Sequence, residues 1–174
     1  RANLLKNLLI TTLILLAVTT TVVFPNNKSL WAALHTVDPQ AYFQVVEDST
    51  SVAAIAETND KGKLLASGQV QANFPYLHIH GLLGSTPALL HPNPEKIMII
   101  GLGSGGTPPT VGVNPLTQKI KIIELLGAEL PVLQQYAQRQ AGKALKHLFQ
   151  DPRYEIIVGD GRRELTMSQE KFDI

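Results

Sequence analysis

The sequence predicts an α/β fold, in which one transmembrane helix and a small antiparallel β region precede a parallel sheet with helical crossovers. Three observations predict it. An uncharged run extends from Leu8 to Phe24, a hairpin turn signal stands at residues 59–62, and the apolar run Ile97–Ile100 leads directly into a glycine-rich turn. Buried parallel strands read as unbroken apolar runs, whereas hairpins need turn residues that tolerate positive φ.

The composition limits the classes of function. With 174 residues, the chain can bury a sizeable core. Its formal net charge of +1 gives no indication of a nucleic-acid partner. The absence of cysteine excludes disulfides and cysteine-ligated metal. Because residue 1 is Arg rather than Met, we expect a piece or a processed form of a longer protein.

Residues 1–25 are predicted to form a transmembrane helix, with residues 4–24 in the lipid bilayer. That run has the length of about 20 residues that a helix needs to cross a bilayer. Threonine hydroxyls within it can bond back to the helix backbone, and Pro25 ends it. A signal peptide and a buried helix of a soluble protein are the alternatives, although no small-x-small cleavage pattern follows Phe24.

The membrane orientation depends on charges that flank this run. Arg1 and Lys6 precede it and Lys28 follows it, so the positive-inside rule favours a cytoplasmic N-terminal side. The rest of the chain would then lie away from cytosolic nucleotides. Any residues upstream of Arg1 would change this count of charges, so the count does not decide the orientation. We expect a membrane protein whose soluble domain lies in the cytoplasm.

Residues 26–42 are a connector, in which Trp31 suits either a membrane interface or a surface helix. Residues 43–90 are predicted to form a small β domain and a linking helix. Its strands are expected at residues 43–48, 51–57, 63–66 and 68–72, with Asn59-Asp60-Lys61-Gly62 as a hairpin turn. The helix is expected at residues 76–90, before Pro92 and Pro94.

Residues 91–174 are predicted to form a parallel sheet that is incomplete in this sequence. Its strands are expected at residues 97–100, 120–123 and 154–158. A short helix is expected at residues 107–113, and a long helical stretch at residues 126–149, broken by Pro131 and Gly142. Residues 171–174 read as the start of a fourth strand, so the C-terminal part of the sheet is missing.

Candidate ligand contacts follow the ends of these strands. Glycines after the first strand let the backbone turn tightly and approach a ligand closely. Glu124 lies about 20 residues further on, where dinucleotide and nucleoside folds place an acid on the ribose hydroxyls. Asp160 ends the third strand on the same edge of the sheet. The alternatives are a turn without a ligand and a surface acid at a strand end.

Together these residues resemble the spermidine synthase (polyamine aminopropyltransferase) family. The resemblance runs from about Glu47 to Ile174 and rests on several spaced motifs: His91-Pro92-Asn93-Pro94, Gly101-Leu102-Gly103-Ser104-Gly105-Gly106-Thr107, Asn114-Pro115, Ile123-Glu124, Asp151-Pro152-Arg153 and Gly159-Asp160-Gly161-Arg162. It implies an N-terminal β domain and a Rossmann-like domain of the methyltransferase type. Some spermidine synthase-like proteins also carry membrane helices before this domain.

The resemblance implies a pocket for decarboxylated S-adenosylmethionine or S-adenosylmethionine as substrate, without a metal. The implied contacts are a floor of Gly101, Gly103 and Gly105 around Ser104, Glu124 on the ribose, Asp160 and Gly161 at the adenine, Gln71 as a further ligand contact and His80 on the amine substrate. His78 and His80 do not share a helix face, which disfavours a metal site.

This sequence departs from the family pattern at several acids. Ser104 stands where the family's turn normally has an acid, and Ser67 replaces the aspartate of the Asp-Gly-x-x-Gln motif. An Asp-Glu pair is replaced by Pro75-Tyr76 or Tyr76-Leu77. A polyamine pocket needs such carboxylates to bind ammonium groups. The family's aspartate base lies a few residues past Ile174, so no catalytic residue is assigned.

Three functions are compatible with these features. The first is aminopropyl transfer from the nucleoside to an amine. The family resemblance implies that the protein would then form a homodimer. The second is S-adenosylmethionine-dependent methyl transfer to another acceptor. The third is a catalytically degenerate, membrane-associated binding or assembly subunit, which the missing acids favour.

Overall fold

A computed structural model describes residues 2–75 and 78–174 of the chain. It divides into two units, Arg1–Thr36 and Val37–Ile174. The predicted helix at residues 76–90 is present from His78, and its first two residues lie outside the described part.

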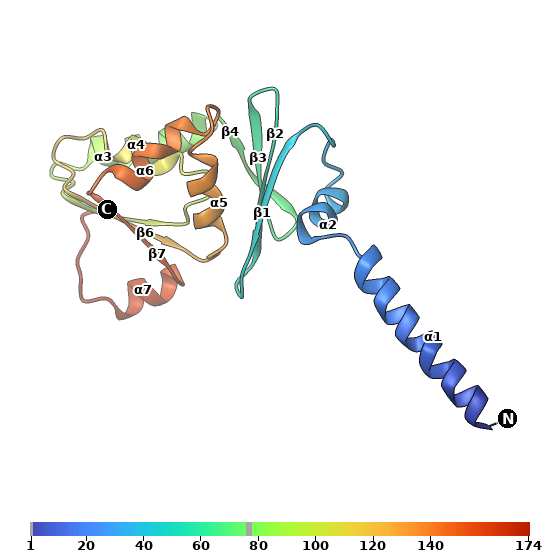
Figure 1. Ribbon diagram of the computed structural model, residues 1–174. Helices are drawn as coiled ribbons and strands as arrows, with labels where there is room; N and C mark the ends of the chain where they lie inside the picture. The colour runs from blue at the N-terminus through green and yellow to red at the C-terminus, as the bar shows by residue number, and fades with distance from the viewer. Residues whose placement is uncertain (1, 76–77) are drawn as a thin grey trace. The chain divides into compact units, whose positions relative to one another are not determined.

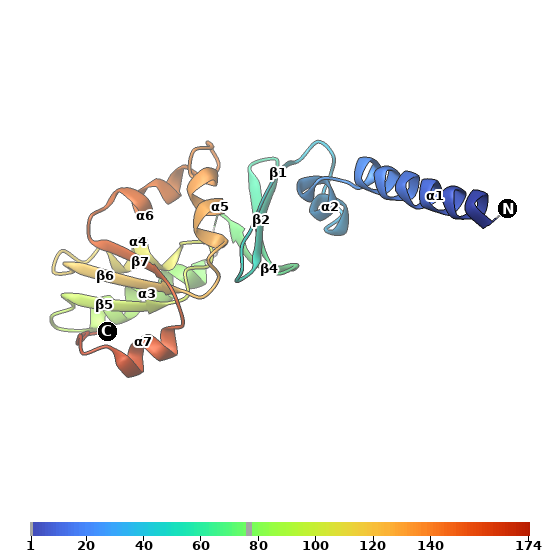
Figure 2. The same cartoon turned by 60° about the horizontal axis from the view of Figure 1, so that its bottom comes forward.

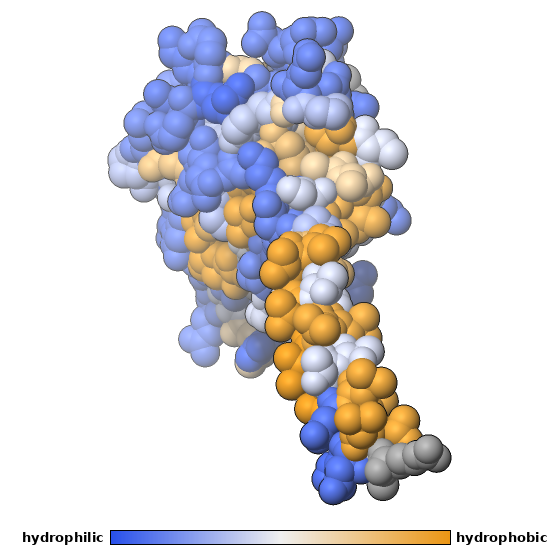
Figure 3. Space-filling view, turned by 45° about the vertical axis from the view of Figure 1, so that its right-hand side comes forward, coloured by the Kyte–Doolittle hydropathy of each residue, from blue (hydrophilic) through white to orange (hydrophobic). Residues whose placement is uncertain are grey.

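The first unit contains two helices, α1 (Ala2–Val23) and α2 (Asn27–Leu34). Residues Asn3–Val23 are long and apolar enough to cross a membrane, by length and composition, and their side chains are exposed. Apolar residues cover most of α1 on the face that Figure 3 shows. As expected, Thr12, Thr19 and Thr20 donate their hydroxyls to carbonyls four residues earlier, at 2.7–2.9 Å. Such bonds leave few polar groups unpaired in an apolar surrounding.

The second unit begins with an antiparallel sheet in the order β1-β2-β3-β4 (Figure 1). The strands are β1 (Tyr42–Glu47), β2 (Val52–Thr58), β3 (Lys61–Ala66) and β4 (Gln69–Phe74). Asn59 and Asp60 both have positive φ, the geometry of the tight turns that match strand twist. The predicted hairpin is therefore confirmed, with β3 starting two residues earlier than expected.

A parallel sheet in the order β5-β6-β7 follows, as predicted. Its strands are β5 (Lys96–Ile100), β6 (Lys119–Glu124) and β7 (Tyr154–Val158). Residues 171–174 have no strand assignment, but the Asp173 amide donates to the Lys96 carbonyl at 2.8 Å and the Met98 amide to the Ile174 carbonyl at 2.9 Å. The expected fourth strand is therefore not formed within residues 171–174, although this segment lies beside β5.

The helices of this unit are α3 (His78–Leu90), α4 (Thr107–Val111), α5 (Glu129–Tyr136), α6 (Lys146–Gln150) and α7 (Gly161–Met167), with a 3-10 turn at Lys143–Leu145. Both Figure 1 and Figure 2 show α5 and α6 on one face of the parallel sheet and α7 on the other.

The predicted helix break at Pro131 is wrong. Pro131 is the third residue of α5, within the first turn, where an amide has no partner in the helix and proline is tolerated. The break at Gly142 is confirmed, because α5 ends at Tyr136 and a Cβ at residue 142 would lie 2.1 Å from the Tyr136 carbonyl oxygen. Helix α7 had not been predicted.

One continuous hydrophobic core joins the two sheets. Ile55 and Leu64 of the antiparallel sheet, Ile120 of the parallel sheet and Leu133 of α5 are all completely buried in it. The Tyr136 ring of α5 packs against the Phe74 ring at the end of β4, with the ring centroids 4.9 Å apart and the ring planes tilted by 50°. Because α5 packs on both sheets, the position of β4 relative to the parallel sheet is determined by this core.

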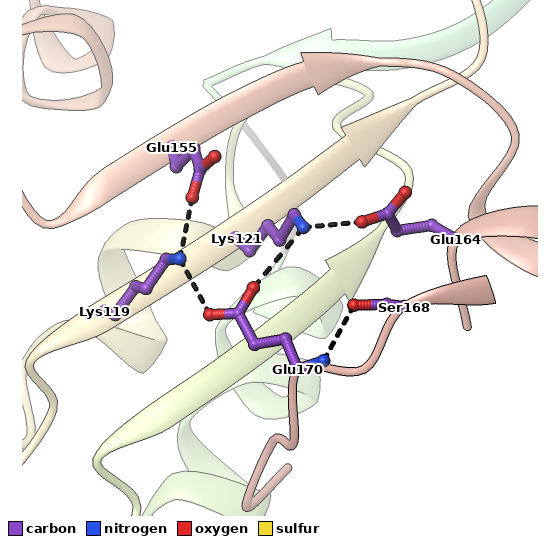
Figure 4. A network of polar contacts seen from close by, with 6 residues as sticks. All are labelled: Lys119, Lys121, Glu155, Glu164, Ser168 and Glu170. Atoms are coloured by element: carbon purple, nitrogen blue, oxygen red, sulfur yellow. Dashed lines mark hydrogen bonds and ion pairs between the residues drawn. The ribbon is translucent and has the colours of Figure 1, made fainter. Parts of the chain in front are cut away.

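A network of charges joins α7 and the segment after it to the centre of the parallel sheet (Figure 4). Lys121 of β6 is only 7% exposed, and its Nζ lies 2.5 Å from Glu164 of α7 and 3.4 Å from Glu170. Glu170 also pairs with Lys119 at 2.7 Å, and Lys119 pairs with Glu155 at 2.9 Å. A buried ammonium needs such partners, so this network holds α7 beneath the sheet.

Candidate functional site

The carboxyl edge of the parallel sheet brings together residues that the sequence had marked. Gly101 follows β5, Glu124 ends β6, and Gly159 and Asp160 follow β7. Because the strands are parallel and adjacent, these residues lie side by side at one edge. In open α/β sheets, ligands bind beyond this edge.

Two adjoining clefts open at this edge. The smaller cleft, of about 360 Å³, is lined by Ile100, Gly101, Ile123, Glu124, Leu125, Gly159, Asp160, Gly161 and Arg162. The larger cleft, of about 540 Å³, is lined by Gln71, Ala72, His80, Ile100, Gly101, Leu102, Gly103, Ser104, Thr107, Glu124, Leu125, Leu126 and Glu129. Gly101 and Glu124 border both clefts and therefore lie where the two meet.

Glu124 is held in place by the loops on either side of it. Its Oε2 accepts a hydrogen bond from the Leu102 amide at 2.6 Å, and its Oε1 accepts one from the Leu126 amide at 2.8 Å. The residue is only 5% exposed. An ionised carboxylate has about four acceptor positions, so both oxygens can still accept a bond from a ligand hydroxyl.

The three glycines of the turn have different surroundings. All have positive φ, which disfavours other residue types. A Cβ at Gly101 or Gly103 would meet no atom within 4 Å, whereas one at Gly105 would approach Leu145 and Leu148 at 3.0 and 3.2 Å. The first two glycines therefore leave open space in the larger cleft, while Gly105 packs against the protein interior and lines neither cleft.

Ser104 and Glu129 are buried polar residues in the wall of the larger cleft. Ser104 is 0% exposed and Glu129 is 2% exposed. The Ser104 Oγ and the Glu129 Oε2 make no hydrogen bond. Burial, together with the charge of Glu124, raises the pKa of Glu129 to about 8. Sequence analysis had missed Glu129, because an acid in the first turn of a helix is common for electrostatic reasons alone.

Asp160 and Gly161 border the smaller cleft, where the predicted adenine would lie. The Asp160 carboxylate is also the N-cap of α7, since its Oδ1 accepts from the Arg162 amide at 2.8 Å and the Arg163 amide at 3.4 Å. A Cβ at Gly161 would lie 2.5 Å from the Ile100 side chain. Helix capping thus accounts for the aspartate at residue 160, and close packing against Ile100 accounts for the glycine at residue 161. Both interactions also hold this wall of the cleft in place.

The two remaining predicted contacts come from outside the parallel sheet. Gln71 of β4 and His80 of α3 both line the larger cleft. His78 lines neither described cleft with them. The replaced acids at Tyr76 and Leu77 lie outside the described residues. Among residues 2–75 and 78–174, no three His, Asp or Glu side chains are placed to hold a metal ion.

Comparison with known proteins agrees with this architecture. The family model for the spermine/spermidine synthase domain matches residues 77–174, more than half of the chain. The chain belongs to the spermine/spermidine synthase family. It is 30% identical over 125 residues to a polyamine aminopropyltransferase of Bacillus mycoides, an alignment that covers 69% of this chain and 42% of that protein.

Two solved structures of the family are also similar. The spermidine synthase of Thermotoga maritima superposes with a TM-score of 0.62 at 25% identity, over 76% of this chain and 45% of that one. A spermidine synthase in complex with the transition state analogue AdoDATO superposes with a TM-score of 0.61 at 26% identity, over 74% and 43%. The chain spans less than half the length of the curated relatives it matches.

Proposed function

We propose that this chain forms the nucleoside-binding part of a membrane-anchored aminopropyltransferase. The single observation that supports this most is the meeting of two clefts at Gly101 and Glu124. A nucleoside with a charged side chain has two ends of different chemistry and a ribose between them. An acid at the junction, with a separate cleft on each side, fits a ligand of that form.

In this proposal the adenine lies in the smaller cleft, against Asp160 and Gly161. The ribose hydroxyls donate to Glu124, whose carboxylate is already oriented by two backbone amides. Gly101 and Gly103 leave room for the sugar and the sulfur to approach the turn. Gln71 and His80 border the part of the larger cleft where the amine substrate enters.

The reaction would be a direct displacement at the carbon beside the sulfonium of decarboxylated S-adenosylmethionine. The acceptor amine forms a new C–N bond, the C–S bond breaks, and methylthioadenosine leaves. The amine loses a proton to a general base. Holding both reactants in line supplies much of the acceleration. No redox step or metal is required for this balance.

The position of residues 171–174 bears on where the base would come from. They lie beside β5 and run in its direction. At about 3.3 Å per residue, a chain that continued past Ile174 in this direction would reach the carboxyl edge of the sheet within a few residues.

The domain division belongs to the same proposal. Residues 1–25 would anchor the protein in the membrane, and residues 26–42 would connect this anchor to the rest of the chain. Residues 43–90 would form the β domain and the linking helix, and residues 91–174 would bind the nucleoside. Helix α1, with its exposed apolar surface, supports the anchor. The alternative of a degenerate binding subunit is favoured by Ser67 and Ser104, where the family has acids.

Calorimetry of the full chain in a non-ionic detergent tests the proposal. We expect methylthioadenosine and decarboxylated S-adenosylmethionine to bind, and Glu124→Gln to weaken both by about tenfold or more, as loss of a charge-assisted bond requires. Glu155→Gln is the matched control, since Glu155 is half-exposed and lines neither cleft. Absence of binding of every such nucleoside, or binding that Glu124→Gln leaves unchanged, would overturn the proposed site.

A further inference from the structure

Helix α3 has a row of large apolar side chains that the rest of the described chain leaves exposed. The opposite side of the helix is buried at Gly84 and Ala88. At about 100° per residue, the exposed side chains fall within an arc of about 120°, which we call the outer face of α3. Its members, each between 52% and 79% exposed, are Ile79, Leu82, Leu83, Leu89 and Leu90.

The buried side of α3 accounts for its place in the fold. A Cβ at Gly84 would lie 2.1 Å from the Thr110 Oγ1 of α4, and the Thr110 hydroxyl donates to the His80 carbonyl at 3.3 Å. Small residues on this side thus let α3 and α4 approach closely. The outer face contributes nothing to that packing. A contiguous exposed apolar surface of this kind marks an interaction site.

The composition of α3 indicates an apolar partner. Its 13 residues include no lysine, arginine, aspartate or glutamate. The outer face therefore offers no charged side chain that a charged partner could recognise. Helices that lie at a membrane surface usually have cations on the opposite side, because that side faces water. The opposite side of α3 packs on α4 instead, so it does not need them.

A lipid surface and a second copy of the chain both have the required chemistry. A helix of 13 residues is about 20 Å long and about 10 Å wide. Even twice its projected area falls well short of the roughly 800 Å² that each partner of a stable dimer buries. A lipid contact needs less area in a chain that is already anchored, because the anchor keeps the domain at a high effective concentration near the bilayer. Helix α1 is long and apolar enough to be that anchor.

We propose that the outer face of α3 lies in the boundary between headgroups and acyl chains of a phospholipid bilayer. This inference rests on the membrane anchor of the proposed function and adds a second membrane contact to it. His80 lies about 100° from Ile79 around the helix and lines the larger cleft. The larger cleft would therefore open close to the lipid headgroups.

Depth-dependent fluorescence quenching of the full chain in phosphatidylcholine vesicles tests this inference. The sequence has no cysteine, so Leu83→Cys can hold a single environment-sensitive dye. Met167→Cys is the matched control, because Met167 is also apolar, is 68% exposed and lies on α7. Nitroxide lipids should quench the dye at residue 83 at a depth of about 5–10 Å and leave the dye at residue 167 unquenched.

A second variant tests whether the whole outer face takes part. Leu82→Gln combined with Leu89→Gln should reduce the quenching at residue 83 several-fold. Because both leucines are exposed, urea unfolding in detergent should be unchanged, which shows that the variant is folded. Quenching that survives both substitutions at full strength would contradict a contact made by this face.

The other outcomes overturn the inference in distinguishable ways. If nitroxide lipids do not quench the dye at residue 83, access of iodide shows that the face lies in water, and protection that is lost on dilution shows a second copy there. Equal quenching at residues 83 and 167 shows insertion without preference for α3. A chain that does not float with the vesicles refutes the anchor and the inference together. Loss of nucleoside binding with quenching retained refutes the proposed nucleoside site alone.

Discussion

Glu129→Gln should stabilise the unliganded protein, and the gain should grow as the pH rises. The pKa of this carboxyl is about 8 in the folded chain and 4.5 ordinarily. Between these two values the folded state binds more protons than the unfolded state. Stability from this group is therefore highest below pH 4.5 and is lost progressively as the pH rises toward 8. Glutamine keeps the size of the side chain but cannot ionise.

The magnitude follows from the two pKa values. Each unit of pKa difference corresponds to about 1.4 kcal/mol. Integrated from pH 5 to pH 8, a shift from 4.5 to about 8 costs the wild-type protein roughly 3 kcal/mol that the glutamine variant does not lose. Glu129 is almost completely buried, so solvent screening reduces this value little. The loss is a sizeable fraction of the 5–15 kcal/mol that stabilises an ordinary domain.

Urea unfolding of the full chain in a non-ionic detergent, at pH 5 and pH 8, measures this effect. The difference in unfolding free energy between Glu129→Gln and wild type should be larger at pH 8 by about 3 kcal/mol. Glu155→Gln, at a half-exposed position, should show little such change. A pH-independent difference for Glu129→Gln would refute the reasoning, because it would show that Glu129 ionises normally in the folded chain.

Three further substitutions probe the scaffold that holds the clefts. Arg139→Ala removes the bidentate partner of the buried Glu57 carboxylate, at 2.9 and 3.1 Å, and should cost about 1–3 kcal/mol by urea unfolding at pH 7. Because Arg139 lowers the pKa of Glu57, the cost should shrink on acidification below about pH 4, and a constant cost would contradict the ion pair. Gly142→Ala should cost about 2–3 kcal/mol by clash with the backbone. Gly103→Ala should cost only about 1 kcal/mol of backbone strain, yet it should weaken methylthioadenosine binding. A melting temperature lower for Gly103→Ala than for Gly142→Ala would refute both assignments.

Local patterns were sufficient to predict most of the elements. The apolar run at β5 and the turn residues Asn59 and Asp60 each determine their local structure through nearest neighbours, so they could be read directly. The predicted helix break at Pro131 was wrong, because the effect of a proline depends on how far it lies from the start of the helix. The start of α5 is determined by packing on two sheets, which short-range patterns do not contain.

The candidate site was predictable only where it lies on the motif. Glu124 and Asp160 were found because strand ends of a parallel sheet must meet at one edge. Glu129 had no such signal, because its importance comes from burial without a hydrogen-bond partner. Gln71 reaches the cleft from another sheet, and that placement depends on the common core around Tyr136.

The glycine-rich turn shows how one motif can combine two physical requirements. Gly101 and Gly103 have open space where a side chain would be. A Cβ at either position would therefore displace ligand or solvent rather than protein atoms. Gly105 has the leucines of the 3-10 turn and α6 at that place, so its substitution would disturb packing instead. Alanine at the first two positions should therefore change binding more than stability, and alanine at the third should change stability more than binding. A turn that served packing alone would have no reason to leave the first two positions open.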